Sequence, residues 1–76
     1  MPGMQQPGVF QRTLLRAFQL PQAYRDVFLL KEIQGHTLEE TAAILGISID
    51  TAWIRLKRAQ RVISRWENAD RMERAR

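Results

Sequence analysis

Apolar residues recur at helical spacing along four stretches of the chain, separated by the turn-forming residues Pro21, Gly35 and Gly46. In residues 9–20 and 21–34, apolar side chains lie three or four positions apart, which aligns them along one face of a helix. No stretch alternates β-branched and polar residues as a strand would. The stripes are Phe10, Leu14, Ala17 and Phe18 in the first stretch, and Ala23, Val27, Leu30 and Ile33 in the second.

The third and fourth stretches carry clear helix ends. In the sequence TLEE, Thr37 and Glu40 form a capping box, and Gly46 ends the third helix because glycine adopts a positive φ readily. Ser48 is placed to cap the fourth helix, and Asp50 suits its first turn. The fourth helix is expected to reach residue 70 or beyond, with a core stripe of Ala52, Leu56, Ala59, Ile63 and Trp66.

These patterns predict an all-α fold: a four-helix domain with a long basic helix at its C-terminal end. A chain of 76 residues fits one domain. Residues 1–8 contain two Gly, two Pro and two Gln without apolar periodicity, so we expect a disordered lead-in or linker. Residues 9–70 are expected to form the domain, and the charged residues 71–76 a frayed tail.

Composition narrows the function. The formal net charge is +4, and five basic residues but no acidic residue lie between Arg55 and Arg65. Such a cluster favours a polyanionic partner, with nucleic acid before an acidic protein surface. The chain has no cysteine, no apolar run long enough to span a bilayer and no signal-peptide pattern, so we expect a cytoplasmic protein without membrane contact.

Candidate chemistry is sparse. His36 is the only histidine, and one histidine without cysteines makes no convincing metal site. Glu39 and Glu40 are adjacent, so they point in different directions on a helix. Ser48 has no neighbouring histidine or lysine to activate it. We therefore expect no enzyme and no catalytic, cofactor or metal site.

The segment Gly46–Ile47–Ser48 joins a short capped helix to a longer basic one, which is typical of a helix-turn-helix. Ala42 is small enough for the fourth helix to cross over it, and Ile47 would fill the gap between the two helices. Ser48 would leave the positive end of the helix dipole free to approach a DNA phosphate. The pattern predicts a DNA recognition helix, with an ordinary helical hairpin as the alternative.

One segment resembles a known family. The sequence LPQAYRDVFLLKEIQGHTLEETAAILGISIDTAWIRLKRAQ, residues 20–60, is similar to region 4 of bacterial sigma factors, especially the extracytoplasmic-function (ECF) group. The Leu-Pro pair, the Tyr-Arg pair, the threonine-capped helix with Glu-Glu and the Leu-Gly-Ile-Ser turn carry the likeness. A LuxR-like regulator domain shares the capped helix-turn-helix, but the Leu-Pro and Tyr-Arg pairs favour sigma.

The resemblance implies that the domain reads the −35 promoter element of double-stranded DNA in the major groove. It also implies docking on the β-subunit flap of the RNA polymerase core. By position, the fourth helix would supply contacts to bases, nearby phosphates or the DNA backbone. Together with the Ser48 cap, the expected DNA-binding residues are Ser48, Ile49, Thr51, Trp53, Ile54, Arg55, Lys57, Arg58 and Arg61.

The chain departs from the family pattern. Region 2 is not among these 76 residues, so we expect one domain of a sigma factor or a stand-alone relative. Trp53 and Ile54 stand where the family usually has a basic residue and a serine, and Gln60 replaces a common arginine. On a helix with Ala52 facing the core, Trp53 lies on the flank and Ile54 nearly opposite the core.

Three interpretations of Trp53 and Ile54 stay open. In the first interpretation, Ile54 contacts a thymine methyl group in the major groove while Trp53 lies along the sugar-phosphate backbone. Alternatively, both residues, with Ile49, form a protein contact for a homodimer or an anti-sigma factor. In the third interpretation they have no function. The wider set proposed for partner contacts is Tyr24, Phe28, Leu29, Trp53, Ile54 and Trp66. For Tyr24, Phe28 and Leu29 the alternative is a place in the core.

Arg55 has two competing roles. It is placed either to contact a DNA phosphate or to form an ion pair with Asp26 or Glu32 of the second helix. The two roles differ physically, because an arginine engaged in an ion pair has less charge to offer to a nucleic acid.

Overall fold

The computed structural model describes residues 9–74, with side chains for residues 11–69. The described chain is all-α and contains no strand. Its elements in chain order are α1 (Val9–Ala17), α2 (Gln22–Phe28), the π-helical segment η1 (Leu29–Ile33), α3 (Leu38–Leu45) and α4 (Ile49–Arg74). The predicted all-α, four-helix architecture is confirmed.

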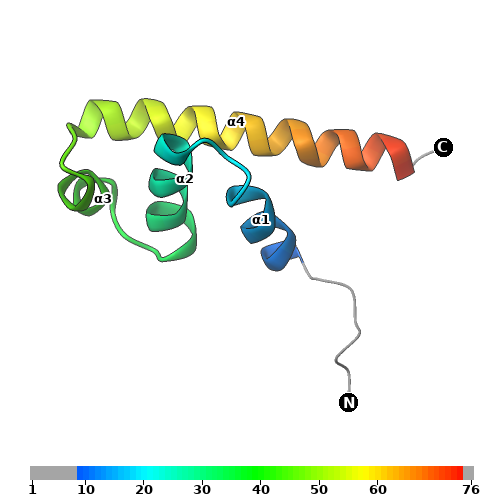
Figure 1. Ribbon diagram of the computed structural model, residues 1–76, viewed down its shortest axis with the longest axis horizontal. Helices are drawn as coiled ribbons and strands as arrows, with labels where there is room; N and C mark the ends of the chain where they lie inside the picture. Colours follow the sequence, from blue (N-terminus) through cyan, green and yellow to red (C-terminus); the bar gives the residue numbers. More distant parts are fainter. Residues whose placement is uncertain (1–8, 75–76) are drawn as a thin grey trace, which may run out of the picture.

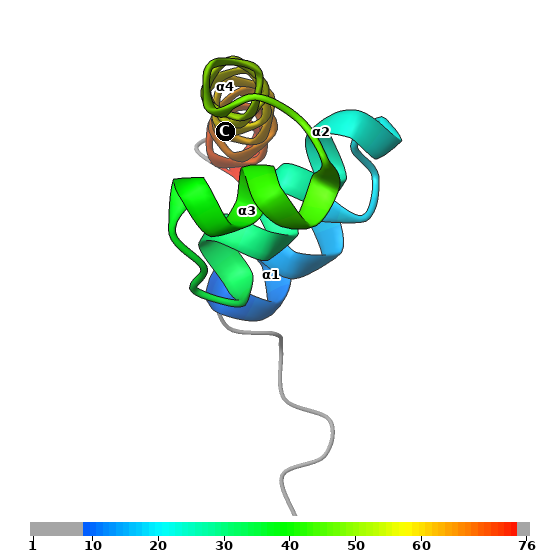
Figure 2. The ribbon, with the colours of Figure 1, turned by 90° about the vertical axis from the view of Figure 1, so that its left-hand side faces the viewer.

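Helix α4 is the longest element, and the shorter helices lie along one side of it (Figure 1). Viewed from the end, α4 lies over a layer formed by α1, α2 and α3 (Figure 2). The Thr13 hydroxyl on α1 donates a hydrogen bond to Glu67 Oε2 on the second half of α4, at 3.3 Å. Helix α4 continues to Arg74, so residues 71–74, assigned from sequence to a frayed tail, are helical here.

The core forms where the predicted stripe of α4 meets α1 and α2. Ala52 and Ala59 have no exposed surface, and their small side chains permit a close approach of the neighbouring helices. Partly buried side chains, including Trp66 and Ile47, pack around this cluster. The buried residues of the cluster are Ala17, Leu20, Val27, Phe28, Leu56, Ala59 and Ile63.

The first helix is shorter than predicted. It ends at Ala17, and the next residues turn, with the Gln19 N–H donating to Arg16 O and the Leu20 N–H to Ala17 O. This turn takes Phe18 off the helical stripe and leaves 57% of its surface exposed, while Leu20 fills the core instead. The prediction of Phe18 as a core residue was wrong for this reason, and the Phe10 side chain lies outside the described residues.

The second helix is also interrupted. Pro21 precedes α2 at its N-terminal end, and after Phe28 the backbone widens into η1, where the Gln34 N–H donates to Leu29 O. A π-helical turn holds an extra residue and so shifts the side-chain register. Val27 is buried as predicted, but Ala23 is exposed. The four residues therefore do not form one uniformly buried face.

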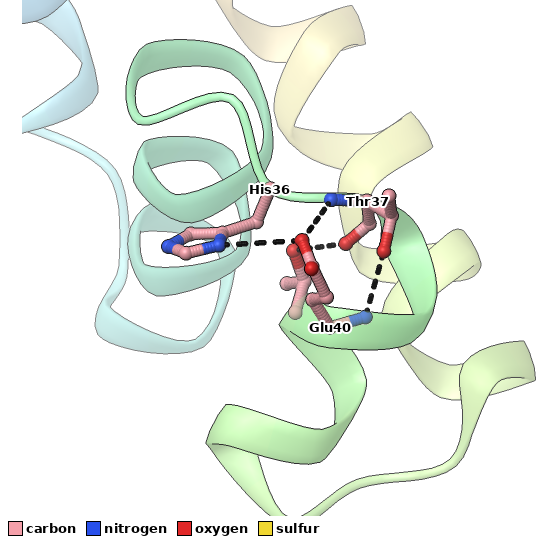
Figure 3. Close-up of polar contacts among 4 residues, drawn as sticks. His36, Thr37 and Glu40 are labelled. Atoms are coloured by element: carbon pink, nitrogen blue, oxygen red, sulfur yellow. Dashed lines mark hydrogen bonds and ion pairs between the residues drawn. The ribbon is translucent and has the colours of Figure 1, made fainter.

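The predicted capping box at the start of α3 is confirmed (Figure 3). The Glu40 N–H donates to Thr37 Oγ1 at 3.0 Å, and the Thr37 N–H donates to Glu40 Oε1 at 2.9 Å. This backbone hydrogen bond, followed by the hydrogen bond with His36, holds the pKa of Glu40 below its usual value. The Thr41 hydroxyl donates to Thr37 O at 2.8 Å, which satisfies a fully buried side chain.

Replacing Thr37 with Ala removes the side-chain acceptor for the Glu40 N–H, so we expect the domain to lose about 1 kcal/mol of stability. In a domain of this size the thermal midpoint should fall by about 4–8 °C. The control Thr37→Ser keeps a hydroxyl and should unfold close to the original temperature. Equal midpoints for Thr37→Ala and the original chain, measured by circular dichroism, would show that the box does not stabilise the domain.

Candidate nucleic-acid interface

The turn between α3 and α4 has the geometry that the sequence predicts. Gly46 has a φ of 69°, in the left-handed region where glycine carries no steric penalty. The Ile47 N–H then donates to Ala42 O at 3.0 Å, which closes the end of α3. Ala42 is buried and Ile47 packs against the core, so α3 and α4 are held at a fixed orientation.

Ser48 fixes the first turn of α4. Its Oγ accepts a hydrogen bond from the Thr51 N–H at 3.0 Å and donates its proton to Thr51 Oγ1 at 2.8 Å. The predicted N-cap is therefore confirmed. Two of the expected DNA-binding residues, Ser48 and Thr51, are hydrogen-bonded to one another, so their hydroxyl groups help to define where the helix begins.

The outward face of α4 lies opposite its buried stripe. Because successive helical residues are rotated by about 100°, Ile54 lies about 200° from Ala52 around the axis. Ile54 and Trp53 are each 48% exposed, as is Ile49 in the first turn. Thr51 and Arg55 lie half-buried on a flank. The exposed members of the predicted DNA-binding set are Ser48, Ile49, Trp53, Ile54, Lys57, Arg58 and Arg61.

Arg55 does not form the ion pair considered from sequence. Asp26 Oδ1 lies 4.0 Å from Nε of Arg25, its neighbour in the chain. Glu32 Oε2 accepts a hydrogen bond from Gln60 Nε2 at 3.2 Å. Within the described part of the chain, Arg55 has neither an ion pair nor a side-chain hydrogen bond. The ion-pair interpretation was wrong because Gln60, one turn and a residue further along α4, reaches Glu32 instead.

The cationic groups of the outward face are also unpaired. Among residues 11–69, no acidic partner lies within ion-pair distance of Arg58 or Arg61. Lys57 behaves differently, because its Nζ lies 4.3 Å from the centre of the Trp53 ring. Such cation–π contacts are attractive and hold the ammonium group in a defined place. The first three turns of α4 thus present apolar side chains flanked by unneutralised positive charge.

Four of the residues expected to form a partner surface pack in or against the core, whereas Trp53 and Ile54 are exposed. Phe28 is buried in the core, which corrects its assignment as a contact residue, because the packing of α2 against α4 encloses its ring. Tyr24, Leu29 and Trp66 are half-buried and pack against the same core. The alternative that these side chains are mainly structural therefore describes them better.

A second exposed apolar surface, not predicted from the sequence, lies on α1 and the turn that follows it. Leu15 is 59% exposed and Phe18 57%. A shallow, open depression beside them is lined by Arg12, Leu15, Arg16 and Gln19. The available signal was the position of Leu15, which lies off the predicted stripe of its amphipathic helix.

Among the described residues, no helix is both long and apolar enough to cross a membrane. These residues also contain no cluster of three or more His, Asp or Glu side chains with the arrangement of a metal site. Their buried side-chain nitrogen and oxygen atoms all have hydrogen-bond partners.

Comparison with protein families gives a match. The family described as "Sigma-70, region 4" matches residues 13–61. The matched segment begins in α1, includes α2, η1 and α3, and ends in α4 at Arg61, the last of the expected DNA contacts. Comparisons with curated proteins and with solved structures each gave no match.

Removing the Arg58 side chain should reduce the salt dependence of DNA binding. Each phosphate contact adds about 0.9 to the slope of log affinity against log salt on duplex DNA. We therefore expect Arg58→Ala to lower the slope by about one unit in a fluorescence anisotropy titration. Lys31→Ala removes a charge from η1 instead and should leave the slope unchanged. An unchanged slope for Arg58→Ala would place Arg58 outside the DNA contact.

Proposed function

The chain belongs to the sigma-70 region 4 family, and on that premise we propose that it is the region 4 domain of an ECF-type sigma factor. Membership of the family implies promoter DNA binding and interaction with RNA polymerase in transcription initiation. The finer proposal is that the domain reads a −35-like element in double-stranded DNA in the cytoplasm. Its action would be binding without a catalytic step.

The exposed face of α4 is the observation that carries this proposal. The turn at Gly46 and the Ser48 cap fix where α4 begins, and the residues opposite its buried stripe, among them Ile54 and Arg58, are exposed. The major groove is about 12 Å wide and admits one α-helix. With α4 in the groove, Arg58 and Arg61 would neutralise phosphates while side chains of the first turns meet base edges.

RNA polymerase would bind on a different surface. Helix α1 lies beneath α4, on the side away from the outward face (Figures 1 and 2). Leu15 on α1 and Phe18 in the turn after it are exposed and offer an apolar contact, whereas Phe28 is buried and offers none. We place the β-flap contact on α1, an arrangement in which one domain can hold DNA and polymerase at the same time.

The competing function is a protein-interaction module with weak or no DNA reading. The observation in its favour is that Ile49, Trp53 and Ile54 are each 48% exposed on the same end of α4. Exposed apolar groups of this kind often mark a protein contact. In this function, the three residues would bind a second copy of the chain or an anti-sigma factor.

Selection from a randomised duplex library decides between the two functions. The proposal predicts enrichment of one short motif, bound with a steep dependence on salt. The competing function predicts no enrichment and a dimer in solution, measured by sedimentation, that dissociates on Trp53→Lys. That second pair of results would contradict promoter reading by this domain.

A further inference from the structure

Ile54 is the feature of α4 that the fold does not explain. It lies opposite the buried stripe and is 48% exposed, so the core neither needs nor covers it. A polar side chain in this exposed place would be better hydrated. An isoleucine here therefore calls for a partner that offers an apolar group at the same spot.

The neighbouring Trp53 is already engaged within the chain. Lys57 Nζ lies 4.3 Å from the centre of its ring, so this ring face is occupied by an ammonium group. The contact also holds the positive charge of Lys57 on the flank of α4, where a wall of the groove would lie. Ile54 has no comparable contact, and its methyl groups are exposed to solvent.

Charge around Ile54 favours nucleic acid over a second copy of the chain. Arg58 lies one turn away on the same face, Arg61 lies just beyond it, and both are exposed. In a symmetric dimer the same patch of both copies would meet, which brings like charges together. A stable dimer also buries about 800 Å² on each partner, more than three half-exposed side chains provide.

Asp50 further restricts how α4 can be oriented in the major groove. It is exposed in the first turn of α4, four residues before Ile54 and therefore beside it. A carboxylate is repelled by phosphates, but it accepts a hydrogen bond from the amino group of cytosine in the major groove. This turn of α4 therefore suits the base edges, and the arginines further along the helix suit the phosphates.

We propose that Ile54 is a specificity-determining residue that recognises the C5-methyl group of a thymine in the major groove. Thymine is the only standard base that presents a methyl group there. The inference rests on the proposed function, because it names what one side chain reads in the bound promoter. It predicts that the preferred site contains a thymine whose methyl group, apart from its hydrogen bonds, contributes to affinity.

Replacing thymine with deoxyuridine tests this directly. The substitution removes the methyl group and keeps the charge and Watson–Crick hydrogen bonds of the duplex. Each thymine of the selected site is replaced in turn, and affinity for the 76-residue chain is measured by fluorescence anisotropy. At one position we expect binding to weaken about fourfold, the effect of losing one buried methyl-sized group.

Two isoleucine variants separate the contact from general effects. Ile54→Ser should bind the thymine duplex about fourfold more weakly and respond no further to deoxyuridine at that position. Ile44→Ser changes a similarly exposed isoleucine on α3, 56% against 48% for Ile54, and should keep the full deoxyuridine response. Both residues are on the surface, and circular dichroism verifies that both variants fold.

The outcomes are distinguishable. A selected motif without thymine, or one whose affinity no deoxyuridine changes, overturns the role of Ile54 and leaves promoter binding intact. A deoxyuridine effect that persists in Ile54→Ser assigns the methyl contact to another residue and also overturns the inference. If no motif is selected, or the chain forms a dimer that Ile54→Ser dissociates, the proposed function itself fails.

Discussion

The burial of one narrow face of α4 is the constraint on which the domain depends. Ala52 and Ala59 have no exposed surface, which permits a close approach of the neighbouring helices, and Leu56 and Ile63 pack in the core with residues of α1 and α2. Within residues 9–74, no second layer covers the opposite face of α4. One helix therefore supplies both the core and the surface available for recognition, and a residue's position around the axis decides which of the two it serves.

Sequence predicted the features that depend on local chemistry. The capping box of Thr37 and Glu40, the left-handed Gly46 and the Ser48 cap each depend on residues within a few positions in the chain, and all three were confirmed. The stripe of α4 was also correct, because a long regular helix keeps its phase. The outward placement of Ile54 follows from that phase alone.

The remaining features depend on tertiary packing or on breaks in the helical register. The turn after Ala17 exposes Phe18, and the π-helical segment η1 changes the phase of α2, although neither has a strong local signal. The partner of Glu32 depends on which residue of α4 reaches it, and Gln60 does so rather than Arg55. Side-chain spacing within one helix does not contain this information.

The domain has two separate exposed surfaces, a face of α4 that we propose reads DNA and an apolar surface at α1 and the turn after it. The most direct test is a nuclear magnetic resonance titration of the chain with its selected duplex, followed through the backbone amide signals. We expect the largest changes in residues 49–61 of α4, while the signals of Leu15 on α1 and of Phe18 in the turn after it stay in place. Changes centred on α1, with α4 unaffected, would contradict the assignment of α4 as the helix that reads DNA.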